Sequence, residues 1–201
     1  MTKWRLVLVI LVAGLLADHG TKYLAVSRLT TALDHGPAAT AGLGTRLQAF
    51  YALKNLEAYA TEPYVVWAPM WRMRYAENPY AAFSLFSGLP VAYRTLFFGV
   101  ITLIATVFIM GYLRKVGQGQ RLTQVTLGLI LTGAWANFLD RLPHGYVVDF
   151  IDWHWWRRPD LYWPTFNIAD SLIVVGVLLL LVLPPSPAKG AGAAKAEAAR
   201  E

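Results

Sequence analysis

Long apolar runs alternate with shorter polar segments along this chain. Four runs, near residues 4–26, 91–113, 122–139 and 166–183, are long enough to cross a hydrocarbon layer about 30 Å thick as helices. Helices are the expected spanning structure, because an open sheet in lipid would leave costly unpaired backbone groups. The pattern therefore predicts an all-α membrane protein with four transmembrane helices.

The segment 27–90, between the first two predicted helices, is too long for a simple connection and is expected to hold structure of its own. Apolar residues between 47 and 59 fall mostly on one helical face, which predicts an amphipathic helix on the membrane surface. Residues 71–75 alternate large apolar and cationic side chains, as in a half-buried strand. We expect a small extracytoplasmic platform that contains helix and β-structure. The role of its portion 34–68 stays open.

Basic residues flank the predicted helices on one side of the membrane, which sets the expected orientation. They are Lys3 and Arg5, then Arg114, Lys115 and Arg121, then Lys189, Lys195 and Arg200. Both termini are therefore predicted to be cytoplasmic, and residues 27–90 and 140–165 to lie outside the membrane. The first helix is expected to be retained and not cleaved as a signal peptide. Ala25-Val26-Ser27 loosely resembles a cleavage site, but Asp18, His19 and Lys22 are polar residues in the stretch just before it.

Composition supports a membrane protein and narrows its chemistry. Hydrophobic residues make up 56% of the chain and charged residues 15%. The net charge of +6 is spread over loops and ends, which argues against a nucleic-acid partner. Cysteine is absent, so thiol chemistry is excluded, and the four histidines show no metal-ligand spacing. Residues 1–183 are expected to form one membrane-embedded domain, and the Pro-rich start of 184–201 predicts a disordered cytoplasmic tail.

Polar residues gather at the predicted outer ends of the helices, where they suggest a functional site. Asp18 and Lys22 lie four apart on one helical face, where an ordinary ion pair is the simplest interpretation. Asp140 beside Arg141 is also compatible with a mere helix end.

Asp170 is harder to explain structurally, because the apolar run that follows it is too short to span alone. The helix must begin before this acid, which then needs a cation or a second carboxyl as a neighbour. Asp149 lies between apolar residues and is a suitable partner, although spacing alone leaves Asp140 and Asp152 as alternatives. Two close carboxyls share one proton and can activate water for peptide hydrolysis, as in aspartic proteases.

The order of short motifs closely resembles the prolipoprotein signal peptidase (signal peptidase II) family over nearly the whole chain. The matching motifs are Asp18-x-x-Thr21-Lys22, Asn78 before Ala81-Ala82-Phe83-Ser84, Gly133-Ala134-x-x-Asn137-x-x-Asp140-Arg141, Val147-Val148-Asp149-Phe150, and Phe166-Asn167-x-Ala169-Asp170-Ser171.

The resemblance implies a four-helix enzyme that cleaves the signal peptide of a bacterial prolipoprotein just before its diacylglyceryl-modified cysteine, without metal or other cofactor. It makes Asp149 and Asp170 the catalytic pair. The other matched residues would shape the site and bind substrate or the inhibitor globomycin (Asn78, Asn137, Arg141 and Asn167) or support its structure (Asp18, Lys22 and Asp140). The expected partners are this lipid-modified substrate and membrane lipids, and the enzyme is expected to act as a monomer.

The sequence departs from the usual family pattern at three places. Pro79-Tyr80 follows Asn78 where a small residue and Gly are common, and Thr132 and Ala136 replace glycines near Asn137. Proline fixes φ and removes a donor, so the backbone around Asn78 is the most affected. As an alternative function, intramembrane acids also occur in small transporters and proton relays, but the predicted cytoplasmic halves of these helices carry almost no ionisable groups.

Overall fold

The computed structural model describes residues 1–80, 88–155 and 158–182. Three helices in this part of the chain are long and apolar enough to cross a membrane: α1 (Lys3–Leu29), α3 (Val91–Lys115) and α4 (Arg121–His144). The fourth predicted segment forms α5 (Ile168–Val182), an apolar helix of 15 described residues. Three membrane-length helices are thus confirmed, and helices α1 and α4 extend beyond their predicted ends at residues 26 and 139.

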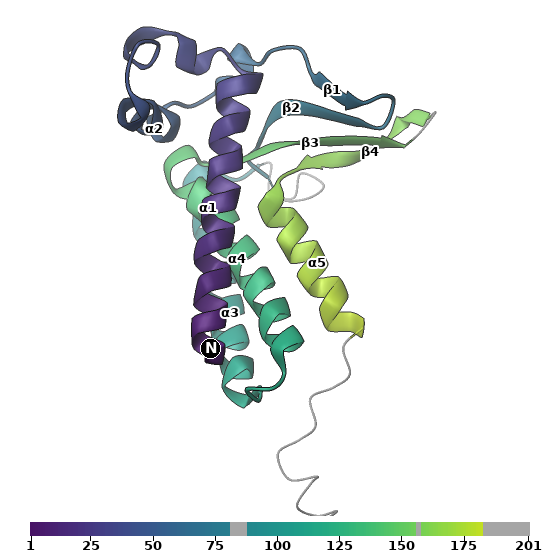
Figure 1. The fold of residues 1–201 in the computed structure, drawn as a ribbon. Coiled ribbons are helices and arrows are strands. Elements are labelled where there is room, and N and C mark those ends of the chain that lie inside the picture. The colour runs from purple at the N-terminus through teal and green to yellow at the C-terminus, as the bar shows by residue number, and fades with distance from the viewer. Residues whose placement is uncertain (81–87, 156–157, 183–201) are drawn as a thin grey trace, which may run out of the picture.

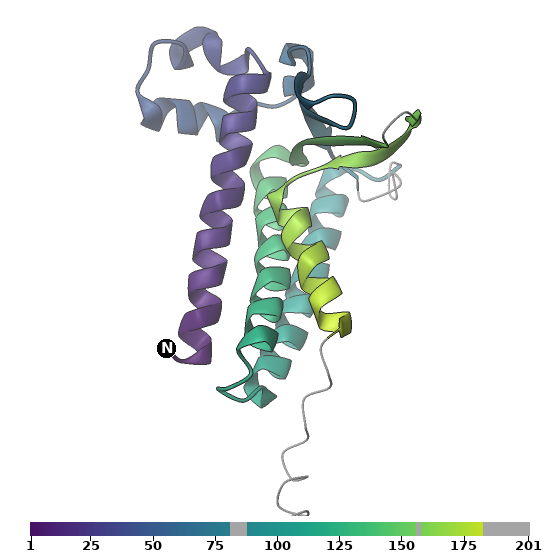
Figure 2. The same cartoon turned by 45° about the vertical axis from the view of Figure 1, so that its right-hand side comes forward.

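Helix α4 lies at the centre of the helical layer and packs against α1, α3 and α5 (Figure 1). A Cβ atom at Gly133 of α4 would meet the carbonyl oxygen of Ala169 and stand 2.6 Å from Ile173 Cγ1, both in α5. Glycine at this position therefore permits the close approach of α4 and α5. Figure 2 shows the N-terminus and the α3–α4 turn at one end of the helices, and the sheet at the other end.

A four-stranded antiparallel sheet in the order β1-β2-β3-β4 covers the end of the helices opposite the N-terminus. Its strands are β1 (Tyr64–Trp67), β2 (Trp71–Asn78), β3 (Val147–Trp155) and β4 (Arg158–Phe166). The predicted strand at 71–75 is confirmed as part of β2. The all-α fold class is wrong, because β3 and β4 also form strands, in a segment predicted only to lie outside the membrane.

The rest of the outer platform is made of short elements packed beside α1. They are helix α2 (Leu43–Ala52) and the 3₁₀ turns Ala32–Asp34, Gly36–Ala38 and Leu56–Tyr59. The amphipathic helix predicted over residues 47–59 is wrong in its extent, since α2 ends at Ala52 and Asn55 adopts a left-handed conformation with φ of 58°. Phe50 of α2 is buried in the platform core. The motif residues 81–84 and the tail 184–201 lie outside the described residues.

Candidate active site

Three buried ionisable side chains tie helix α1 to the rest of the site. Lys22 Nζ lies 2.6 Å from Asp18 Oδ2 and 2.7 Å from Asp140 Oδ2, and all three side chains are fully buried. Asp18 also accepts a 2.8 Å hydrogen bond from the backbone N–H of Ala169, and Asp140 accepts one of 3.3 Å from Val148 N–H. Asp18 and Lys22 therefore form more than the ordinary ion pair expected from the sequence, because Asp140 also contacts Lys22. The triad joins α1, α4, α5 and β3, and each buried charge has an opposite charge beside it.

Asp149 and Asp170 come together although they lie on different elements. Asp149 is buried in β3, and Asp170 lies in the first turn of α5. Asn167, just before α5, donates from Nδ2 to Asp149 Oδ1 over 2.7 Å. The same residue forms a reciprocal cap with Asp170: its Oδ1 accepts from Asp170 N–H at 2.9 Å, and Asp170 Oδ2 accepts from Asn167 N–H at 3.3 Å. One helix cap therefore holds both carboxylates.

Two further asparagines complete the first set of contacts around the acids. Asn78 Nδ2, at the end of β2, donates to Asp149 Oδ2 over 2.9 Å, and Asn137 Nδ2 of α4 donates to Asp170 Oδ1 over 2.7 Å. Asn137 Oδ1 in turn accepts from Lys22 Nζ at 3.3 Å and from Asn167 Nδ2 at 3.1 Å. This network connects the carboxyl pair to the buried ion triad.

The surroundings of Asp149 favour its protonated form. Burial, followed by the charge of Asp170, raises the pKa of Asp149 to about 7, while the hydrogen bonds from Asn78 and Asn167 act in the opposite direction. Two neighbouring carboxyls cannot easily both ionise, so the pair retains one proton near neutral pH. Such a pair has the two forms that acid–base catalysis needs, one donor and one acceptor.

Asp152, the other candidate partner from the sequence, belongs to a different cluster. Its Oδ2 lies 2.8 Å from Arg72 Nη2 and 3.1 Å from His154 Nε2, on the face of the sheet opposite Asp149. Burial alone would raise the pKa of Asp152, but the hydrogen bonds of His154 and Arg72 outweigh it and hold the pKa below its ordinary value. Asp152 is therefore an ionised salt-bridge partner. Asp140 likewise forms an ion pair, with Lys22.

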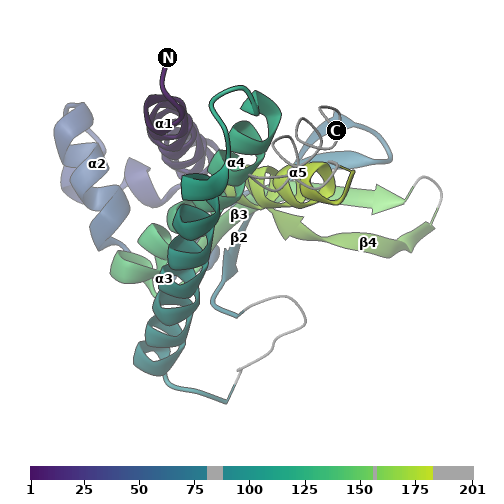
Figure 3. The ribbon, with the colours of Figure 1, turned by 90° about the horizontal axis from the view of Figure 1, so that it is seen from below.

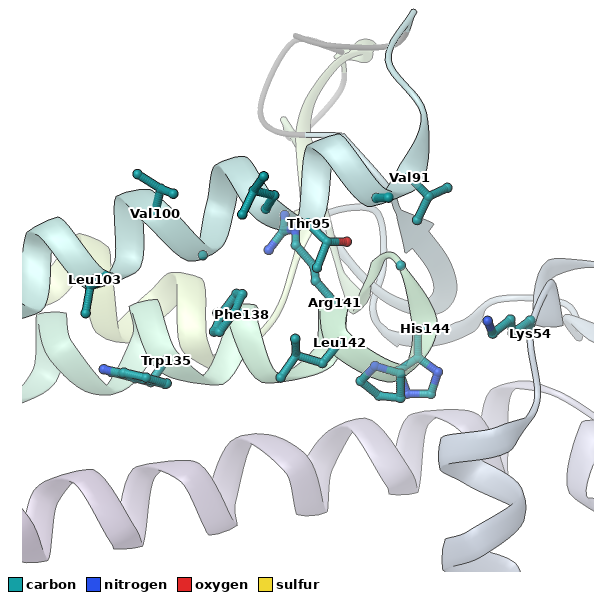
Figure 4. A pocket seen from close by; sticks show the side chains of 15 residues that line it. Lys54, Val91, Thr95, Val100, Leu103, Trp135, Phe138, Arg141, Leu142 and His144 are labelled. Carbon is teal, nitrogen blue, oxygen red and sulfur yellow. The ribbon is translucent and has the colours of Figure 1, made fainter.

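Arg141 connects the acids to an open groove between α3 and α4. Its guanidinium stacks on Phe98 of α3 at 4.0 Å from the ring centroid, and Nη1 donates to the carbonyl of Asn137 over 2.9 Å. The groove has a volume of about 890 Å³ and is lined mainly by apolar side chains (Figure 4). Its ionisable side chains, Arg141, His144 and Lys54, lie toward the end near the sheet, and its apolar end reaches Leu103 and Trp135.

No pattern in the sequence predicted this groove. The only available signal was Gly99 within an apolar helix: a Cβ at this position would stand 2.9 Å from the ring of Phe138, so the glycine leaves room for that ring beneath the groove. A pattern of apolar residues does not show which of them face a neighbouring helix and which line an opening.

The departures from the family pattern are accommodated locally. Asn78 remains in register opposite Val147 and reaches Asp149 although Pro79 follows it. Thr132 is buried and donates to the carbonyl of Gly128 over 2.7 Å. Ala136 is also fully buried. Among the described residues, no group of three or more His, Asp or Glu side chains has an arrangement that could hold a metal ion.

Comparisons with known proteins agree with one another. A lipoprotein signal peptidase of Anaeromyxobacter sp. (strain Fw109-5) is 53% identical over 197 residues, which are 98% of this chain and 92% of that protein. One from Polynucleobacter necessarius is 37% identical over 160 residues, covering 80% of this chain and 86% of that protein. A solved bacterial membrane enzyme, 27% identical, superposes with a TM-score of 0.61 over 88% of this chain and 85% of that one. The family model described as Signal peptidase (SPase) II matches residues 10–183, so this chain belongs to the signal peptidase II family.

Proposed function

We propose that this protein is a membrane-embedded aspartic endopeptidase that removes the signal peptide from diacylglyceryl-modified prolipoproteins, cutting just before the lipidated cysteine. The observation that carries the proposal is the pairing of Asp149 and Asp170 through Asn167, at the end of the helices covered by the sheet. A single chain supplies both carboxyls, so a monomer suffices. The transporter alternative finds no support in the family or in the relatives.

The proposed reaction uses the two protonation states of the pair. The ionised carboxyl takes a proton from water as the water oxygen attacks the carbonyl carbon of the scissile peptide bond, and the protonated carboxyl donates to the carbonyl oxygen. The tetrahedral intermediate then collapses. The C–N bond breaks, the cysteine nitrogen receives the proton that the first carboxyl took from water, and a hydroxyl of the intermediate returns its proton to the second carboxyl. Asn78, Asn137 and Asn167 orient the carboxylates, since their side-chain N–H groups donate to them.

The place of the pair suits a substrate anchored in lipid. A diacylglyceryl group keeps the scissile bond near the lipid headgroups, and the acids lie where α5 meets the sheet. The groove between α3 and α4 offers an apolar surface for chains of this lipid, with Arg141 between groove and acids.

The orientation proposed for the protein places the sheet outside the cytoplasmic membrane and the N-terminus inside. Lys3 Nζ donates to the carbonyls of Leu113 and Val116 at 2.7 and 2.8 Å, and Arg121 donates to the carbonyl of Met1 at 2.7 Å. These contacts gather positive side chains at one end of the helices, which supports a cytoplasmic position for that end.

The test follows cleavage of a diacylglyceryl-modified prolipoprotein by the full-length protein in lipid vesicles. Asp149→Asn and Asp170→Asn should each lower kcat by at least about a thousandfold, because removal of one member of such a unit abolishes its proton transfer. Asp152→Asn is the matched control, since Asp152 lies three residues along the same strand but on its other face, and it should retain activity. Undiminished cleavage by either of the first two variants would refute the proposed pair.

A further inference from the structure

Four tryptophans form a row across all four strands of the sheet. Trp67 of β1 lies opposite Trp71 of β2, Trp71 lies opposite Trp153 of β3, and Trp153 lies opposite Trp163 of β4. Directly opposed residues of antiparallel strands point to the same face. The exposed fractions of Trp67, Trp153 and Trp163 are 59%, 53% and 64%. Three of the four indoles are thus accessible on one face of the sheet, and Trp71 is half-buried.

This face is the one that carries Asp149. Residues 149, 151 and 153 are regularly spaced in β3, so Asp149 and Trp153 lie on the same side of the strand. Asp149 contacts Asn167, from which α5 runs away from the sheet. Figures 1 and 3 show that the distal ends of β3 and β4 project beyond α5. The tryptophan row therefore faces the same side as the membrane-length helices, beside α5.

The two faces of this projecting sheet differ in chemistry. On the face opposite the tryptophans, Arg72 and Arg74 lie 2.8 and 3.6 Å from Asp152, and Arg74 donates to Thr165 over 2.8 Å. A charged face and an aromatic face back to back are what a sheet lying at a membrane surface requires. Indole rings are enriched at the headgroup level because one edge is apolar and the N–H is polar. Helix α5, which begins beside this sheet, also exposes apolar side chains such as Val174, Leu178 and Leu181.

We propose that the tryptophan row lies in the headgroup layer of the phospholipid bilayer and holds the sheet at that level. Asp149 is four residues from Trp153 along β3, about 13 Å at the rise of an extended strand. Because the strand is continuous and paired on both sides, the level of the row sets the level of Asp149. The row thereby fixes the height at which a lipid-anchored bond meets the carboxyl pair.

The location of the row is tested with single spin labels, which the chain permits because it contains no cysteine. Trp163→Cys and Trp153→Cys carry the label on the aromatic face, and Arg74→Cys carries it on the charged face. The full-length labelled proteins are placed in vesicles of phosphatidylethanolamine and phosphatidylglycerol. Labels at 153 and 163 should lose collisions with a water-soluble nickel chelate and retain those with oxygen, whereas the label at 74 should remain accessible to nickel.

Two results would overturn the proposal. In the first, labels at 163 and 74 are equally accessible to the nickel chelate. In the second, the label at 163 becomes protected only after a non-cleavable substrate peptide is added, which would make the row a peptide-binding surface.

A second experiment, which rests on the proposed peptidase function, tests whether the row sets the level of Asp149 relative to the lipid headgroups. The triple variant Trp67→Ser, Trp153→Ser and Trp163→Ser should lower kcat/KM for a vesicle-embedded substrate more than for the same substrate in detergent. The control is Trp4→Ser, since Trp4 is exposed near the N-terminal end of α1, away from the sheet. This variant should change kcat/KM little, and equally, in vesicles and in detergent. Equal losses in vesicles and detergent for the triple variant would refute the height-setting role. If the wild type cleaves neither substrate, the peptidase function fails, while the spin-label result still decides where the row lies.

Discussion

Asn167 donates a 2.7 Å hydrogen bond from its side-chain nitrogen to Asp149, and the same side chain caps the helix on which the second carboxyl lies. The position of one acid is therefore tied to the start of α5, which carries the other. Asn167 thus both caps α5 and links the two carboxyls of the site.

The variant Asn167→Ser separates these two roles. Serine is also a good N-cap, so α5 should form normally, but it lacks the amide N–H that reaches Asp149. We expect kcat to fall about a hundredfold, as for a small misplacement of a catalytic group, with little change in thermal unfolding. Steady-state cleavage measures kcat, and a melting curve of the same preparation measures thermal unfolding. Wild-type activity in this variant would show that the bridge is unnecessary.

The pH dependence of cleavage should follow the carboxyl pair. Since the pKa of Asp149 is raised to about 7, the shared proton is present below that pH and is lost as the pH rises through it. We expect kcat/KM to fall about tenfold per unit above pH 7. Asn78→Ala should move this limb to higher pH, because the hydrogen bond from Asn78 lowers the pKa of Asp149. A limb that stays in place would mean that another group controls the profile.

Lys22→Met should destabilise the protein strongly. The change leaves Asp18 and Asp140 buried beside each other without their cation, and breaking a buried pair costs about 3–5 kcal/mol. Lys115→Met, at an exposed position in the last turn of α3, is the matched control and should have little effect. Unfolding in detergent micelles compares the two. Equal stability of both variants would contradict the structural role of the triad.

Gly133→Ala should weaken the contact of α4 with α5. The added Cβ would meet the Ala169 carbonyl and Ile173, and such overpacking costs about 1–3 kcal/mol. Because Asp170 follows Ala169, cleavage activity should fall as well. Gly111→Ala in α3 has nothing within 4 Å of the new Cβ and should be neutral or up to about 1 kcal/mol stabilising. The prediction fails if both alanine variants behave alike in unfolding and cleavage.

The helices and the family could be predicted from the amino-acid sequence alone. Apolar runs place α1, α3 and α4 because burial of the backbone in lipid demands helices of a minimum length. The alternation at residues 71–75 located β2, since side chains of a strand point to opposite faces. The order of the short motifs identified signal peptidase II, and it selected Asp149 over Asp140 and Asp152, a choice that spacing alone left open.

The contacts between these residues depend on the packing of distant segments and could not be predicted from the sequence. No local pattern shows that Lys22 lies between Asp18 and Asp140, because the contact of Lys22 with Asp140 joins two distant segments of the chain through the packing of α1 on α4. Strands β3 and β4 were missed because β3 is stabilised by pairing with β2, a distant segment, and β4 by pairing with β3. The tryptophan row exists only in the paired sheet, since its four members come from four strands and share a face through their register.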